Sequence, residues 1–134
     1  MQFYSTNRKT SPVSLREAVV RGLAADRGLF MPEVIRRFPP AFYQNMKEMT
    51  LREISFVVAE AFFGEDVEAG KLKEIVDETL NFDIPLVQVA DNRYSLELFH
   101  GPTLAFKDVG ARFMARLLAY FNKQEGERQV NVLV

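Results

Sequence analysis

The sequence contains no cysteine and only one histidine, His100, among its 134 residues. Without cysteine the chain can form neither a disulfide framework nor a thiolate metal site, and a single histidine cannot build a multi-histidine metal centre. A charge excess of one sign is also missing, because 17 basic residues face 18 acidic ones. Nucleic-acid-binding surfaces usually carry a strong basic excess, so we expect no nucleic acid among the partners.

Long hydrophobic runs are absent as well. None approaches the roughly 20 residues that cross a bilayer, and the polar start, MQFYSTNRKTSP, has no apolar segment of the signal-peptide kind. We therefore expect no membrane association and a cytoplasmic protein. The composition that is present, 48% hydrophobic with 12 phenylalanines, can build a core. The length suggests one domain, or one domain and the start of another.

Three helices are predicted in the first 80 residues, at 15–23, 51–63 and 67–80. Ser14 with Glu17, and Thr50 with Glu53, have the spacing of a capping box. Gly64 is expected to end the second helix with a positive φ. The prolines at 32, 39 and 40 predict a segment between them that is irregular or only briefly helical. The helical period predicts these inward residues: Ile54, Val57, Val58, Ala61 and Phe62, then Leu72, Ile75, Val76 and Leu80.

After residue 81 the period changes. Residues 86–90 and 93–99 read as strands joined by an Asp-Asn turn, which predicts a β-hairpin. A helix is predicted at 105–121 and a buried strand at 129–134. The expected apolar stripe of that helix is Val109, Phe113, Met114, Leu117, Leu118 and Phe121.

The end of the chain predicts one β-α-β unit, which belongs to a parallel sheet that needs further strands. We therefore expect a part of a longer α/β protein. Residues 1–91 would be a mainly helical N-terminal domain with a small hairpin, and residues 92–134 the first piece of an α/β domain.

The segment 97–108 carries the candidate chemistry, and its centre is Lys107. A lysine in the first turn of a helix meets the positive end of the helix dipole, and any burial would disfavour its charged form further. A free amine is what imine chemistry requires. The position therefore suits a Schiff-base lysine, although it is also an ordinary place for an exposed lysine.

Three neighbours of this lysine have structural explanations that compete with chemical ones. His100 could donate a proton, but we favour a bond to a backbone carbonyl in the turn. Thr103 could cap the helix through its hydroxyl. Asp108 would complement the helix dipole, and we favour that role over catalysis.

The run from residue 96 to 108, LELFHGPTLAFKD, closely resembles the motif around the cofactor lysine of threonine synthases. The similarity also covers YST at 4–6, Ala18, GLA at 22–24 and DRGLFMP at 26–32, which look like the opening segment of that family's branch with a long N-terminal domain. The helical stretch 51–80 fits with weaker motifs. The resemblance thus covers essentially the whole chain.

This resemblance implies a pyridoxal 5'-phosphate (PLP) enzyme of fold type II that converts O-phospho-L-homoserine and water into L-threonine and phosphate. Lys107 would hold PLP as a Schiff base and, once freed, move protons between the α and β carbons of the substrate. Phe106 and Asp108 would bind the cofactor, with Thr103 and His100 as weaker candidates. The family's remaining cofactor-binding loops match nothing in the 134 residues, so we expect the chain by itself to be inactive.

Two alternatives stay open at this point. One is a related phospho-lyase that acts on another phosphorylated amino acid, since most of the substrate pocket would lie beyond these residues. The other is a domain without catalysis that acts in binding. The sequence leaves the oligomeric state open.

Overall fold

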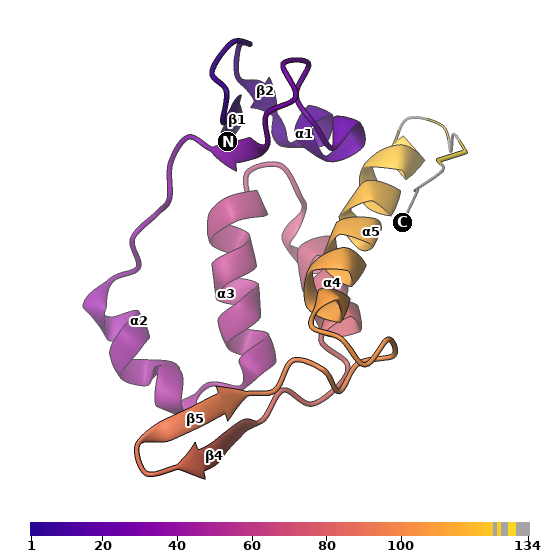
Figure 1. Cartoon of the computed structure of the whole chain (residues 1–134). Coiled ribbons are helices and arrows are strands. Elements are labelled where there is room, and N and C mark those ends of the chain that lie inside the picture. Colours follow the sequence, from indigo (N-terminus) through magenta and orange to yellow (C-terminus); the bar gives the residue numbers. More distant parts are fainter. Residues whose placement is uncertain (125, 127–128, 131–134) are drawn as a thin grey trace.

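The computed structural model describes residues 1–124, 126, 129 and 130, and shows five α-helices, one short 3₁₀ helix and two small sheets within them (Figure 1). This mixture confirms the predicted combination of helices with small β elements. The predicted strand at 129–134 falls mostly outside the described residues. In chain order the elements are β1 (Gln2–Ser5), β2 (Val13–Ser14), α1 (Leu15–Arg21), β3 (Phe30–Pro32), α2 (Pro40–Asn45), η1 (Met46–Glu48), α3 (Leu51–Phe63), α4 (Ala69–Thr79), β4 (Leu86–Ala90), β5 (Arg93–Leu96) and α5 (Lys107–Gln124).

A three-stranded antiparallel sheet, in the order β2-β1-β3, was not predicted. Phe3 of the central strand lies opposite Val13 on one side and Pro32 on the other. Strands of two to four residues are too short to show a period, and Pro32 had argued for irregular backbone. Proline is tolerated here because β3 is an edge strand.

Ser14 and Thr50 cap α1 and α3 as predicted, although the reciprocal capping box is complete only at α3. The Ser14 hydroxyl accepts from the Glu17 amide at 3.2 Å, and Thr50 and Glu53 form a complete capping box at the start of α3. Gly22 ends α1 with φ at 70°. The prediction for Gly64 was wrong, because its φ is −65° and the chain continues through a turn of helical backbone.

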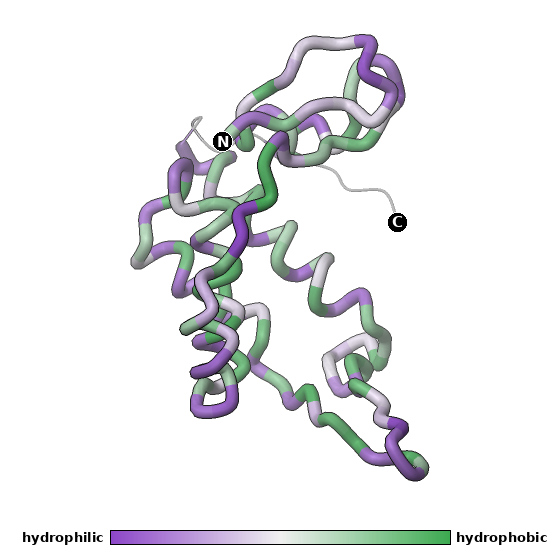
Figure 2. The backbone as a smooth tube through the Cα atoms, turned by 90° about the vertical axis from the view of Figure 1, so that its left-hand side faces the viewer, coloured by the Kyte–Doolittle hydropathy of each residue, from purple (hydrophilic) through white to green (hydrophobic). Residues whose placement is uncertain are grey.

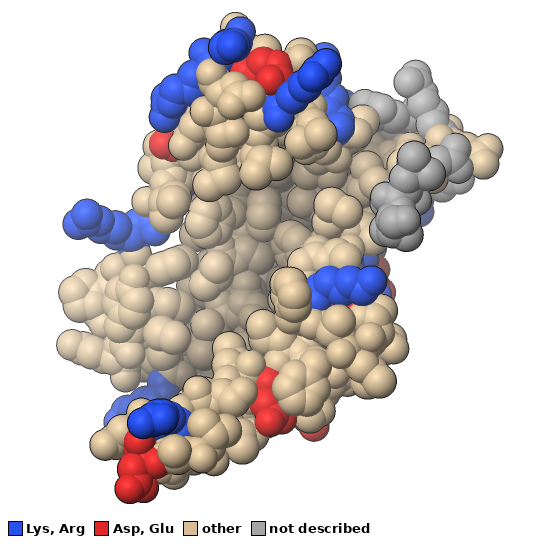
Figure 3. All heavy atoms as spheres, in the orientation of Figure 1, with Lys and Arg blue, Asp and Glu red and all other residues tan. Residues whose placement is uncertain are grey.

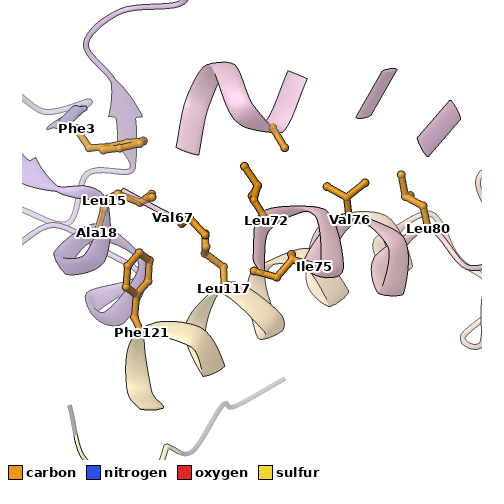
Figure 4. Close-up of a cluster of buried hydrophobic side chains, with 11 residues drawn as sticks. Phe3, Leu15, Ala18, Val67, Leu72, Ile75, Val76, Leu80, Leu117 and Phe121 are labelled. Atoms are coloured by element: carbon orange, nitrogen blue, oxygen red, sulfur yellow. The ribbon is translucent and has the colours of Figure 1, made fainter. Parts of the chain in front are cut away.

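The core lies where α1, α4, α5 and β1 meet (Figure 4). All four predicted inward residues of the third helix, Leu72, Ile75, Val76 and Leu80, are buried. Leu117 and Phe121 of α5 close the core from the other side, next to Leu15. Met114 was also predicted to face inward, and this was wrong, since its side chain is 48% exposed.

A wide apolar groove of about 720 Å³ explains that exception. It runs between α3 and α5 and reaches α1, and Figure 3 shows its hollow surface almost free of charged side chains. Met114 lines the groove, as do Ile54, Val58 and Phe62 from the predicted stripe of α3. These three are therefore only half-buried. The predicted stripe of α3 is apolar but not buried, because α3 and α5 do not close over it. The residue of α3 that is buried, Ala59, was not predicted.

The predicted hairpin is present as β4-β5, with Val87 opposite Ser95 and a shift in register between Gln88 and Ala90. Asn92 supplies the left-handed turn residue that a glycine would usually provide, with φ at 56°. Most of the hairpin is exposed, including the large side chains of Leu86, Val89, Tyr94 and Leu96.

Hydrophobic and hydrophilic residues alternate along the backbone rather than forming one long apolar stretch (Figure 2). No helix in the described part of the chain is long and apolar enough to cross a membrane.

Candidate active site

The loop that leads into α5 folds back on itself in a tight turn. The Leu104 amide donates to the Gly101 carbonyl at 3.0 Å, and Asp108 and Val109 donate to the carbonyls of Ala105 and Phe106. Leu104 has φ at 54°, a left-handed backbone that is uncommon for a residue with a side chain. The loop is therefore held in a shape that its local sequence does not favour.

Asp108 holds that loop from the inside. Its side chain is only 3% exposed, and one carboxylate oxygen, Oδ2, accepts from the Thr103 amide at 2.8 Å and from the Thr103 hydroxyl at 2.9 Å. The prediction that Thr103 caps the helix was wrong, because its hydroxyl is bound to Asp108 and α5 begins four residues later. The two donors satisfy a carboxylate that would otherwise be costly to bury.

Gly101 makes this packing possible. A Cβ atom at this position would lie 2.6 Å from Oδ2 of Asp108 and 2.8 Å from its Cβ. The φ of Gly101 is not positive, so it is the close approach of the carboxylate that requires glycine here.

Lys107 lies in the first turn of α5, as predicted, although the helix begins at Lys107 itself and not at residue 105. Its side chain is exposed. The burial that would favour a free amine is therefore not supplied by the described residues. Leu104 and Phe106 are 78% and 73% exposed beside it, and no ion pair joins Lys107 to another residue of the described chain. The amine thus stands at an open, apolar edge of the molecule.

His100 has a partner other than the predicted backbone carbonyl. Its Nε2 lies 2.7 Å from Oε2 of Glu97, and its ring stacks on Phe99 with the ring centroids 4.8 Å apart. Sequence reasoning missed Glu97, although its spacing of three from His100 was a usable signal. His100 also lines a groove with Leu51, Arg52, Phe82 and Pro85, which places it beside the start of α3.

Two arginines fix the start of α5 against α4. Arg112 donates to the Glu78 carbonyl at 2.8 Å and to the Asn81 side chain at 2.9 Å, and Arg116 pairs with Glu78. Together with the buried Leu117, these bonds attach the helix that carries Lys107 to the core. No local pattern in the sequence indicated these pairs, because their members are more than 30 residues apart.

Far from Lys107, the first 30 residues contain a second tightly bonded cluster around Asp26. Its carboxylate accepts from the Ser5 hydroxyl at 2.6 Å, from the Gly28 amide at 3.0 Å and from the Lys9 amide at 2.9 Å. These bonds, led by Ser5, lower the pKa of Asp26 below its usual value. A Cβ at Gly28 would lie 2.0 Å from the Ser5 hydroxyl, so the spacing of Ser5, Asp26 and Gly28 is fixed by packing.

No group of three or more His, Cys, Asp or Glu side chains among the described residues is arranged to hold a metal ion. The chemistry of the candidate site therefore depends on the amine of Lys107 and the side chains next to it.

Comparison with known proteins places this geometry in a family. The family described as "Threonine synthase N terminus" matches residues 2–80. A threonine synthase of Serratia marcescens is 38% identical over 99% of the chain, and one of Escherichia coli is 35% identical over 99%. In both cases the chain spans 30% of the relative's length.

Solved structures agree with the sequences. A PLP-bound threonine synthase from Brucella melitensis superimposes with a TM-score of 0.89 at 34% identity, over 96% of this chain and 29% of that one. The threonine synthase of Escherichia coli gives 0.84 at 36% identity, over 90% and 28%.

Proposed function

The chain belongs to the threonine synthase family, and from this premise we propose that it is the N-terminal part of a PLP-dependent threonine synthase in which Lys107 binds the cofactor. The observation that carries the proposal is the exposed lysine at the first position of α5. It directly follows a loop in which Leu104 has a positive φ and Thr103 is bonded to Asp108. The PLP-bound relative from Brucella melitensis, which matches 96% of the chain, supports the choice of cofactor.

The residues present fit this cofactor. An aldehyde needs an amine that it can reach, and the amine of Lys107 is exposed, with no ion-pair partner among the described residues. Phe106 offers an exposed aromatic ring next to it, which suits a flat, aromatic cofactor. Bound PLP would supply an electron sink for carbanions formed on the substrate.

The substrate we propose is O-phospho-L-homoserine, which water converts to L-threonine and phosphate. Once the substrate amine has displaced it from the cofactor, the freed Lys107 amine would be the base that moves protons at the α and β carbons, because it stays beside them. The bonds from Arg112 and Arg116 to the end of α4 would keep the start of α5, and so the amine, in a fixed place during those steps. We place the parent enzyme in the cytoplasm.

The parent enzyme is expected to be about three times as long as this chain, since the chain spans 30% of its relatives. Backbone donors that would hold the cofactor's phosphate, of the kind found at helix N-termini, would come from that remainder. We therefore expect residues 1–134 alone to be inactive and to bind PLP weakly.

The test uses the full-length parent enzyme with PLP, reduced by borohydride and mapped by mass spectrometry. We expect one stoichiometric adduct, on Lys107, and release of phosphate from O-phospho-L-homoserine. Lys107→Ala should lose the adduct and at least about a thousandfold in turnover. Lys123→Ala, at an exposed lysine near the other end of α5, is the matched control and should behave as wild type.

Two results would contradict the proposal. An adduct on another lysine would remove Lys107 from the chemistry. Phosphate release from phosphothreonine and not from O-phospho-L-homoserine would instead show a phospho-lyase on a different substrate.

A further inference from the structure

We propose that Asp108 is a positioning residue for Lys107, which ties Thr103 to the first turn of α5 and does not touch the cofactor itself. The inference rests on the proposed function of Lys107 and adds to it the device that holds the amine in place.

The device is a closed loop of residues 103–108. Oδ2 of Asp108 accepts both the amide and the hydroxyl of Thr103, at 2.8 and 2.9 Å. Lys107 lies inside the stretch that these bonds close, directly before Asp108 in the chain. Any opening of the two bonds would therefore release the backbone of the residue that carries the amine.

The direction of the Asp108 side chain separates this role from cofactor binding. Successive helical residues point about 100° apart, and Asp108 points inward, 3% exposed, while Lys107 is exposed. The carboxylate would have to break both bonds to Thr103 and leave a buried site in order to reach a group attached to Lys107.

The backbone conformation at Leu104 shows why residues 103–108 need a stabilising contact. Leu104 has a left-handed φ of 54° with its side chain 78% exposed, so its own packing does not impose that conformation. Such conformations persist where the surroundings determine them. Asp108, which bonds to the residue before Leu104 and packs within 2.6 Å of a Cβ position at Gly101, is the group that does so.

The experiment compares Thr103→Val, Asp108→Asn and the double variant in the full-length parent enzyme. It measures the rate at which PLP attaches to Lys107, trapped by borohydride, at temperatures well below each variant's Tm. A role limited to folding would lower Tm but leave this rate unchanged in the folded protein. Thr103→Ser keeps the hydroxyl, and Thr10→Val is the control at a threonine remote from the loop.

We expect Thr103→Val and Asp108→Asn each to slow attachment about tenfold, the scale of one hydrogen bond to a charged group. The double variant should be no slower than Asp108→Asn, because the hydroxyl bond that Thr103→Val removes is one of the two bonds to Thr103 that Asp108→Asn already weakens. Thr103→Ser should restore the rate, and Thr10→Val should match wild type.

Two outcomes would overturn the inference, and they can be told apart. If wild type attaches PLP at Lys107 and the effects of Thr103→Val and Asp108→Asn multiply in the double variant, the two residues act independently and only the positioning role fails. If wild type forms no adduct on Lys107, the proposed function fails and the positioning role fails with it.

Discussion

Single residues in this molecule are constrained by what lies against them more than by their own conformational preference. Gly101 has no positive φ, but its Cβ position is occupied by the Asp108 carboxylate. At Gly28 a side chain is excluded in the same way, because its Cβ would clash with the Ser5 hydroxyl. Gly110, in α5, has nothing within 4 Å of its Cβ position.

These glycines give a matched pair of substitutions. Gly101→Ala should lower the free energy of unfolding by about 1–3 kcal/mol, the usual cost of overpacking. Rotation of the Asp108 carboxylate cannot relieve the clash, because the Cβ of Asp108 would be only 2.8 Å away. Urea unfolding at neutral pH measures the change.

Gly110→Ala is the control at an open helical position. We expect it to raise the free energy of unfolding by about 0.5–1 kcal/mol, because alanine has the better helix propensity. Equal effects of the two alanines would contradict the close packing at Gly101.

At the scale of the helices, hydrogen bonds at the N-terminus of α3 fix where that helix begins. Thr50 and Glu53 satisfy each other's backbone amides at the start of α3, at 3.3 Å and 2.7 Å. The apolar stripe of α3 buries little surface in the core, since it borders the open groove. The capping box should therefore matter more for α3 than for a fully packed helix.

Removing this cap tests that expectation. Thr50→Ala should cost about 1 kcal/mol of unfolding free energy, within the range of measured N-caps, and should reduce helix content by circular dichroism. Thr50→Ser keeps the hydroxyl and should remain within a few tenths of wild type. A loss as large in Thr50→Ser would show that the methyl group, and not the cap, stabilises the site.

At the scale of the whole molecule, the core and an ion-pair cluster at the N-terminus join the N-terminal sheet to the helices. The Met1 amine lies 2.9 Å from Glu65 and 3.1 Å from Asp66, in the turn between α3 and α4. Arg36 also pairs with Glu65. The bond to Glu65 is the main cause that raises the pKa of the Met1 amine.

This raised pKa predicts a loss of stability at alkaline pH. The folded chain holds the proton more tightly than the unfolded chain, whose amine has a pKa near 8.0. The contribution is therefore complete below pH 8 and is lost as the pH rises through the higher folded value. We expect a small fall in the urea midpoint across that window.

Acetylation of the Met1 amine provides the control for this effect. The acetylated chain has no charge to lose, so its urea midpoint should be lower at pH 7 and nearly constant up to pH 9. An equal alkaline fall in both chains would assign the effect to another group.

The sequence by itself determined the helices of the core, the capping residues of α1 and α3, the hairpin and the place of Lys107 in the first turn of α5. Each depends on neighbours within a few residues: a repeat of apolar positions, a hydroxyl three residues before a carboxylate, or a motif read directly. Leu72, Ile75 and Val76 illustrate this, because their spacing alone placed them inward.

Tertiary structure decided the rest, because the partners are distant in the chain or oppose a local preference. The sheet of β1, β2 and β3 has strands too short to show a pattern. The Thr103 hydroxyl could have capped the helix, but it donates to Asp108 instead. Met114 has the spacing of a core residue, but its side chain faces the groove. A sequence states which surfaces are apolar and which groups can bond, whereas packing decides which of them meet.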